Sequence, residues 1–203
     1  MRHFATDTMT RRAMIGGMLS AGLLIALGTP ARAASAMQAE SLVDRLVGDI
    51  NGVISTGASE QQMIAQFDRI FRSYGDMSYI AAYVMGVEAR RASAAQKKAF
   101  TQAFSSYISR KYGKQFRKFV GGRIDVQGTK AVKNAYQVST LAYLRGQSPF
   151  DVTFFVGEKS GKFFNMYVEG VNMLLTERTE IGSMLDRRGG NIDAMIADLR
   201  AAG

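Results

Sequence analysis

The sequence predicts an α+β fold: a mostly helical N-terminal half packed on an antiparallel sheet of about four strands, followed by C-terminal helices. Two patterns predict it. Apolar residues recur every three or four positions from residue 39 to 120, whereas apolar and polar residues alternate from residue 123 to 175. Short turns between the alternating segments favour an antiparallel meander, and helices that precede such a sheet are typical of the α+β class.

The N-terminal half contains start and stop signals for four helices. Ser59 and Asp76 are residue types that cap helices, and Ser93 with Gln96 forms a capping box. Gly86 is interpreted as the end of the third helix. The expected helices are Ala39–Ile54, the segment between Ser59 and Gly75, the segment from Asp76 to Gly86, and a long helix from Ser93 to about Val120.

The C-terminal half is interpreted as strands separated by turns, followed by two helices. Gly146–Pro149 and Gly157–Gly161 are the turn segments. The alternation places Val152, Phe154 and Val156 on the inner face of one strand. The expected strands are Arg123–Lys130, Asn134–Leu144, Phe150–Val156 and Lys162–Leu175, and the expected helices are Thr176–Arg187 and Ile192–Arg200.

The first 33 residues have the order of a bacterial export signal. Arg11-Arg12 precede an uncharged, mostly apolar run from Ala13 to Leu27, and the small-residue site Ala31–Ala33 follows. We expect a signal peptide over residues 1–33 and one periplasmic domain over residues 34–203. The segment Thr10–Ile15 also resembles a twin-arginine signal, so general secretion and twin-arginine export both stay open.

Composition excludes several classes of enzyme. The only histidine, His3, lies in the expected signal peptide, and the chain has no cysteine. The expected mature domain therefore lacks Ser-His-Asp triads, thiol nucleophiles, histidine or cysteine metal sites and disulfides. We expect no enzyme, no metal and no cofactor. The remaining enzyme hypothesis is a hydrolase that uses Glu169 or Asp68. It is the weaker interpretation, because no second carboxylate follows at a recognisable spacing.

Positive charge is concentrated in one segment. The chain carries +9, and without residues 1–33 it has 22 basic and 16 acidic residues, or +6. From Arg90 to Ile124 there are ten Lys or Arg residues and no Asp or Glu. Arg110, Lys114 and Arg117 share a face of the long helix. This face is either a docking surface for acidic membrane complexes or anionic headgroups, or the solvated side of a core helix. We do not expect a nucleic-acid partner.

Large, flexible apolar side chains are frequent. Eight methionines follow residue 33, and the chain has no tryptophan. On the long helix, Phe100, Phe104, Tyr107 and Ile108 share a face. Methionine adapts to irregular partners, so these residues fit a cavity for flexible chains, but they fit an ordinary core equally well.

Four segments form a recognisable set of motifs: Asp76–Gly86, Arg90–Gln96, Tyr167–Val171 and Gly190–Ile196. Together they resemble the toluene-tolerance family, which is typified by the periplasmic phospholipid-binding component of the Mla lipid-transport pathway. The resemblance spans residues 39–199, nearly the whole expected mature chain.

The chain departs from the family pattern at three positions. Asn165 stands where the family usually has Asp, Asn172 where it has Ser, and Ile181 where it has an aromatic residue. These differences suggest a divergent branch. Related proteins are encoded with hopanoid-synthesis genes, so a hopanoid-type polycyclic lipid is the alternative to a diacyl phospholipid.

The resemblance implies a monomeric carrier that holds lipid acyl chains in an apolar cavity. Such a carrier shuttles lipid between outer- and inner-membrane complexes, one of them linked to an ABC transporter, and so supports outer-membrane lipid asymmetry. A third hypothesis is an adaptor that docks membrane complexes and holds no ligand. The candidate lipid-binding residues are Phe67, Ile70, Phe71, Met77, Ile80, Tyr83, Val84, Phe100, Phe104, Tyr107, Ile108, Val138, Phe154, Phe164, Met166 and Val168.

Overall fold

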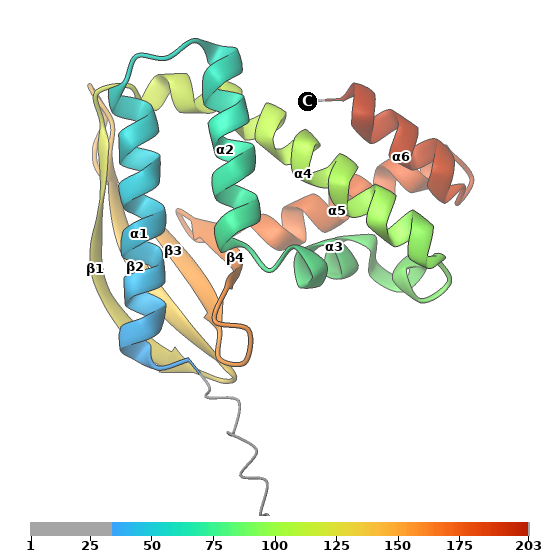
Figure 1. Cartoon of the computed structure of the whole chain (residues 1–203), viewed down its shortest axis with the longest axis horizontal. Coiled ribbons are helices and arrows are strands. Elements are labelled where there is room, and N and C mark those ends of the chain that lie inside the picture. The colour runs from blue at the N-terminus through green and yellow to red at the C-terminus, as the bar shows by residue number, and fades with distance from the viewer. Residues whose placement is uncertain (1–33, 203) are drawn as a thin grey trace, which may run out of the picture. The chain divides into compact units, whose positions relative to one another are not determined.

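Six α-helices and a five-stranded antiparallel sheet form the part of the chain that the computed structural model describes, residues 34–202 without the side chains of Phe116 and Arg117. The predicted α+β class is confirmed (Figure 1). The expected signal peptide, residues 1–33, lies outside the described residues.

The second, third and fourth helices begin at the caps that the sequence predicts. The side chains of Ser59 and Asp76 accept backbone N–H groups at the starts of their helices, and Ser93 and Gln96 exchange capping hydrogen bonds. The helices are α1 (Ala36–Ser55), α2 (Glu60–Tyr74), α3 (Met77–Met85) and α4 (Ala94–Phe116), with short 3-10 turns η1 (Gly86–Arg90) and η2 (Arg117–Phe119).

The first helix begins three residues earlier than predicted. Ser35 and Gln38 form a capping box immediately before the apolar stripe, which places the start of α1 at Ala36 instead of Ala39. This capping box lies directly after the expected cleavage site, where the predicted signal peptide ends.

The sheet is a meander in which each strand pairs with the next. Its strands are β1 (Arg123–Val132), β2 (Ala135–Tyr143), β3 (Phe150–Gly157), β4 (Phe163–Val168) and β5 (Val171–Asn172). All four pairings are antiparallel. The tight β1–β2 connection uses Asn134 at a positive φ of 58°, a conformation that asparagine tolerates.

The prediction of one strand from Lys162 to Leu175 is wrong. β4 ends at Val168, and Glu169 and Gly170 turn the chain at positive φ angles of 49° and 80°. The two residues of β5 pair back onto β4, and Asn172 then caps α5 (Met173–Arg187), which begins before the predicted Thr176. The last helix, α6 (Ile192–Ala201), starts at the predicted position.

A bulge in β4 changes which of its side chains face inward. Phe155 pairs with Asn165 and Val156 with Phe163, so Phe164 is the additional residue. Simple alternation predicts that Phe163 faces away from Met166. The bulge instead places Phe163 opposite the buried Val156, and its exposed fraction is only 5%.

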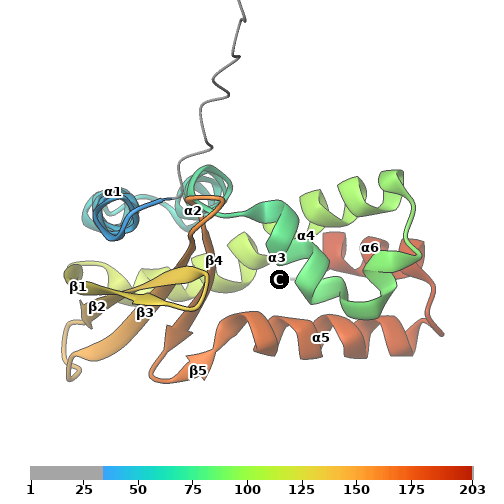
Figure 2. The ribbon, with the colours of Figure 1, turned by 90° about the horizontal axis from the view of Figure 1, so that it is seen from below.

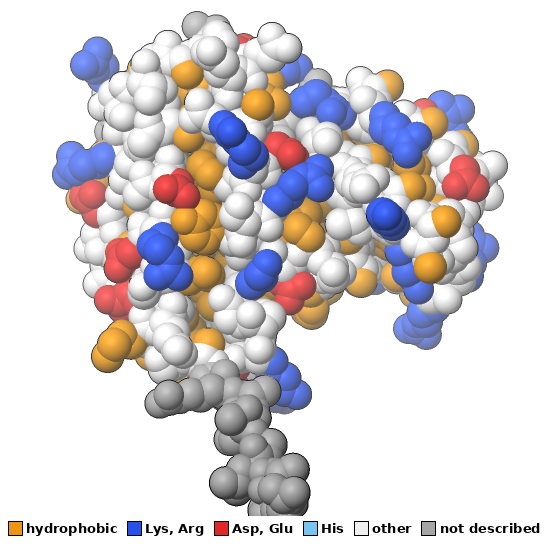
Figure 3. Space-filling view, viewed as in Figure 1, with side chains coloured by type: hydrophobic (Ala, Val, Ile, Leu, Met, Phe, Trp, Pro, Cys, Tyr) orange, Lys and Arg blue, Asp and Glu red, His pale blue; other side chains and the backbone are white. Residues whose placement is uncertain are grey.

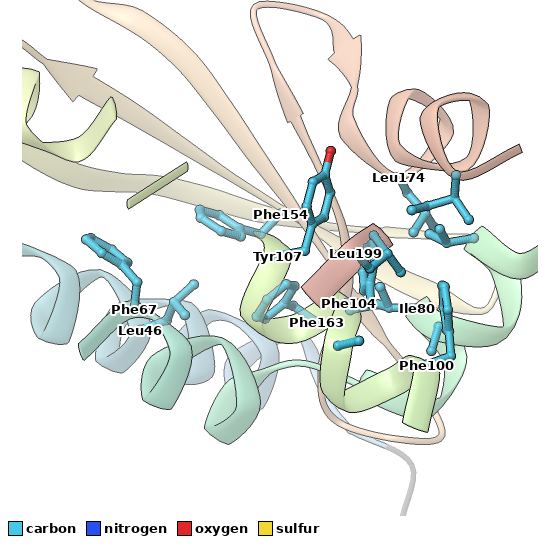
Figure 4. Packing of buried hydrophobic residues seen from close by; sticks show 14 of the residues in the cluster. Leu46, Phe67, Ile80, Phe100, Phe104, Tyr107, Phe154, Phe163, Leu174 and Leu199 are labelled. Atoms are coloured by element: carbon cyan, nitrogen blue, oxygen red, sulfur yellow. The ribbon is translucent and has the colours of Figure 1, made fainter. Parts of the chain in front are cut away.

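The helices form two groups around the sheet. α1 packs along β1 and β2, and α2 lies beside α1 and crosses α4. Figure 2 shows α1 and α2 on one side of the sheet, with α3, α5 and α6 grouped beyond its β4 side. α4 starts in this group and runs back past α2 toward β1 (Figure 1). α3 packs on α5, and α6 on α4. One continuous apolar core joins both groups to the sheet (Figure 4).

Candidate functional site

An apolar cavity lies between the inner face of the sheet and helices α1, α2, α4 and α5. It contains about 1120 Å³ of space without protein atoms, part of which is open to solvent, and its wall is almost entirely apolar. The residues that line it are Leu46, Ile50, Phe67, Ile70, Phe71, Ile80, Phe104, Ile108, Ser109, Tyr112, Gly113, Phe119, Ile124, Phe150, Val152, Phe154, Phe163, Phe164, Asn165, Met166, Val168, Met173, Leu174 and Glu177.

The periodicities of helices and strands direct these side chains into the cavity. Leu46 and Ile50 are four positions apart on α1, so they project from the same face of that helix. On the strands, Val152 and Phe154 point inward because they are two positions apart. Figure 4 shows Leu46 and Phe67 on the helical side of this space and Phe154 on the sheet side.

The cavity wall includes many of the predicted lipid-binding residues. Their shared feature is an apolar side chain on α2, α3, α4 or the inner side of the sheet. Those in the wall are Phe67, Ile70, Phe71, Ile80, Phe104, Ile108, Phe154, Phe164, Met166 and Val168.

The other predicted residues are not part of the cavity wall: Met77, Tyr83, Val84, Phe100, Tyr107 and Val138. Val84, Phe100 and Val138 have exposed fractions of at most 1%, so they are packed core residues. Tyr83 instead lies under the guanidinium of Arg178, 5.1 Å from its ring centroid. Apolar periodicity identifies the inward face of an element but not whether that face meets the cavity or the packed core, so it does not separate these six residues from those in the wall.

The wall also contains residues outside the predicted lipid-binding set. Among them are Leu46 and Ile50 of α1 and Val152 of β3, together with the polar residues Tyr112, Asn165 and Glu177. Glu177 carries no local signal, because it stands in an ordinary helical segment of the sequence.

A buried polar cluster interrupts the apolar wall. Oε1 of Glu177 accepts hydrogen bonds from Nζ of Lys111, at 2.8 Å, and from the hydroxyl of Tyr112, at 2.5 Å. Glu177 is only 4% exposed. The Lys111 ammonium also lies 5.3 Å from the ring centroid of Tyr107. The cluster thus pairs a buried carboxylate with one cation and one phenol.

Burial and hydrogen bonding keep the Tyr112 phenol and the Lys111 ammonium protonated. Burial, and then the hydrogen bond to Glu177, raise the pKa of Tyr112, so its hydroxyl remains a donor at neutral pH. Burial opposes the charged form of Lys111, but its contacts with Glu177 and Tyr107 outweigh burial and raise its pKa.

A comparison with models of protein families shows which family the chain belongs to. The profile described as "MlaC protein" matches residues 40–201. This chain belongs to the MlaC family. The family resemblance predicted from the sequence motifs is therefore confirmed.

A solved structure has the same fold as this MlaC family member. It is a phospholipid-binding protein from Ralstonia solanacearum, determined in complex with a phospholipid at 1.53 Å resolution. The two chains share 17% sequence identity with a TM-score of 0.66, and the match covers 82% of this chain and 95% of the other.

The basic face of α4 in this MlaC family member is partly used inside the fold. The guanidinium of Arg110 donates to the carbonyls of Leu199, at 2.7 Å, and Ala202, at 2.6 Å, which lie at the end of α6. This contact caps the C-terminal end of α6 and gives Arg110 a structural role. Lys114 is exposed, and the side chain of Arg117 lies outside the described part of the structure. Figure 3 shows Lys and Arg side chains spread over α2 and the helices beyond it.

The carboxylates of the enzyme hypothesis have separate structural settings. Asp68 accepts hydrogen bonds from Ser105, Ser109 and Arg72, and so connects α2 to α4. Glu169 is exposed in the β4–β5 turn. Within residues 34–202 no group of three acidic or histidine side chains could hold a metal ion, and no helix in this range is long and apolar enough to cross a membrane.

Proposed function

We propose that this chain is a periplasmic lipid carrier that holds the acyl chains of one membrane lipid in the cavity. The observation that carries the proposal is the apolar wall contributed by α1, α2, α4, α5 and the sheet. Membership of the MlaC family and the phospholipid held by the protein from Ralstonia solanacearum support it.

Transfer free energies are sufficient for non-covalent carriage. Each methylene group moved from water into an apolar site contributes about 0.8 kcal/mol. An acyl chain can therefore be bound tightly without a covalent bond, a metal or a cofactor. Release then needs only a membrane or partner complex that offers the chain a comparable apolar environment.

The finer assignments belong to the same proposal. The carrier is a single domain over residues 34–203 that is exported behind a signal peptide. It moves as a monomer between inner- and outer-membrane complexes and docks through exposed basic residues of α4. Its ligand is a diacyl phospholipid, with a hopanoid-type lipid as the alternative.

Native mass spectrometry of the protein purified from its own host tests carriage. We expect a mass increase that disappears on solvent extraction, together with a lipid in the extract. The extracted protein should take up lipid again from vesicles of the host's phospholipids. A protein that is empty in repeated preparations and takes up nothing from vesicles would instead support the ligand-free adaptor.

A further inference from the structure

One atom of the cavity wall lacks the partner that its chemistry requires. Among the described residues, Oε2 of Glu177 is the buried side-chain oxygen or nitrogen without a hydrogen-bond partner. The other oxygen of the same carboxylate accepts two hydrogen bonds, from Lys111 and Tyr112. Buried polar atoms in folded proteins nearly always have a partner, because leaving one without a hydrogen bond is costly.

The other polar side chains in the wall are already engaged within the protein. Ser109 donates to Asp68 and to its own helix. Asn165 donates to Asn172, and its oxygen accepts the backbone N–H of Leu174. Oε2 of Glu177 therefore differs from its polar neighbours in the wall, since it offers an acceptor that the protein does not use.

This acceptor belongs to a residue of the cavity wall, and the ion pair of that residue reaches the protein surface. Glu177 follows Met173 by one helical turn on α5, and both residues line the cavity. The side chain of its partner Lys111 is 28% exposed, so the ion pair extends from solvent to the cavity wall. A group of the ligand that is near solvent while its chains lie in the cavity can reach such a position.

Only a hydrogen-bond donor satisfies this atom. Ester carbonyls and ionised phosphates are acceptors, and a second acceptor beside a carboxylate oxygen is repelled. We propose that Oε2 of Glu177 accepts a hydrogen bond from a hydroxyl or ammonium group of the bound lipid, so that the cavity selects lipids that carry such a donor. This inference rests on the proposed function and adds the chemical class of the ligand.

The donor can come from a phospholipid headgroup or from a hydroxylated polycyclic lipid, and a loading experiment separates the two sources. The protein is stripped of lipid and offered vesicles that contain two lipids in equal amounts. Loaded lipid is then counted by mass spectrometry. One set compares dioleoyl phosphatidylethanolamine, its N-methyl and N,N-dimethyl derivatives, and phosphatidylcholine. The other compares a hopanoid polyol with its hydrocarbon parent.

The methyl series distinguishes hydrogen bonding from size. The first three headgroups keep at least one N–H donor, whereas phosphatidylcholine has none. A hydrogen bond to a charged acceptor predicts a preference of at least about tenfold that is lost only at the last methyl group. If the hydroxyls of a polycyclic lipid are the donor, the polyol should be preferred by a similar factor and the methyl series should be flat. A gradual decline with each methyl group, or no preference in either set, overturns the inference.

A variant pair tests the residue itself. Glu177→Gln keeps the size of the side chain but replaces the charged acceptor, so the preference should fall to less than about twofold. Glu180→Gln is the matched control, because it makes the same charge change on α5 outside the cavity wall. Equal loss of preference in both variants would overturn the role of Glu177. If Glu177→Gln does not fold, the lipid preferences of the wild-type protein in the two vesicle sets still test the inference.

Failure of this inference is distinguishable from failure of the proposed function. A protein that loads every lipid equally is a carrier without donor selection. A protein that loads no lipid from any vesicle is not a carrier, and then the proposed function itself is wrong.

Discussion

Gly113 of α4 lies directly against Ile64 of α2. A Cβ atom at position 113 would be 2.7 Å from Cγ1 of Ile64 and 3.2 Å from its Cα. This glycine therefore allows the two helices to approach closely beside the cavity.

Substitution of this glycine should destabilise the protein although alanine is the better helix former. We expect Gly113→Ala to lower the free energy of unfolding by about 1–3 kcal/mol, because the methyl group overpacks the contact with Ile64. Gly182→Ala on α5 is the matched control. Its Cβ would meet nothing within 4 Å, so we expect a gain of about 0.5–1 kcal/mol. Urea denaturation measures both, and a gain in both variants would contradict the packing argument.

Substitutions at two valines of the sheet should distinguish a residue of the cavity wall from a residue of the packed core. Val168 lines the cavity and is partly exposed, whereas Val138 is fully buried and does not line it. We expect Val168→Arg to fold and lose bound lipid. Val138→Arg buries a charge and should cost about 4 kcal/mol or more. Thermal melting and lipid content, measured on the same samples, check both. Retained lipid in a folded Val168→Arg protein would remove this residue from the ligand site.

The cap that Arg110 provides should be measurable in α6. Arg110→Gln removes charged hydrogen bonds to the carbonyls of Leu199 and Ala202, and we expect a loss of about 1–2 kcal/mol. Amide hydrogen exchange should increase first in the last turn of α6. The control is Lys98→Gln on the exposed side of α4, for which we expect a change within about 0.5 kcal/mol. Unchanged exchange in α6 would show that this cap is dispensable.

Docking should depend on exposed basic residues near the end of α4. We expect Lys114→Glu/Lys118→Glu to leave the fold and bound lipid intact but to slow lipid transfer to membrane complexes. The wild-type rate should fall with salt, because the screening length decreases from about 10 Å at 0.1 M to about 3 Å at 1 M. The matched control, Lys130→Glu/Lys133→Glu, makes the same charge change around the β1–β2 turn. Equal rates for both variants at every salt concentration would leave this end of α4 as a solvated surface.

The raised pKa of Tyr112 has a consequence at alkaline pH. The folded protein keeps the phenol protonated at a pH where the unfolded chain has released that proton. The corresponding stability is complete below the ordinary tyrosine pKa of about 10 and decreases as the pH rises above it. Urea midpoints of wild type and Tyr112→Phe from pH 8 to 11 test this, and the variant should show the smaller alkaline decrease. Parallel curves would contradict it.

The sequence by itself predicted what depends on near neighbours in the chain. Ser59, Asp76 and Ser93 begin their helices as expected, because a cap involves residues only three positions apart. The inward face of β3 followed from its alternation for the same reason. The family motifs added the expectation of a lipid cavity.

Only the tertiary structure decided which inward residues meet a cavity and which meet the core. Phe100 and Phe104 share one face of α4 and both are buried, yet only Phe104 lines the cavity. The inward turn of Phe163 depends on the register between β3 and β4. Glu177 becomes a polar point in the wall through contacts with residues more than 60 positions away. Such arrangements depend on long-range packing, which local periodicity does not encode.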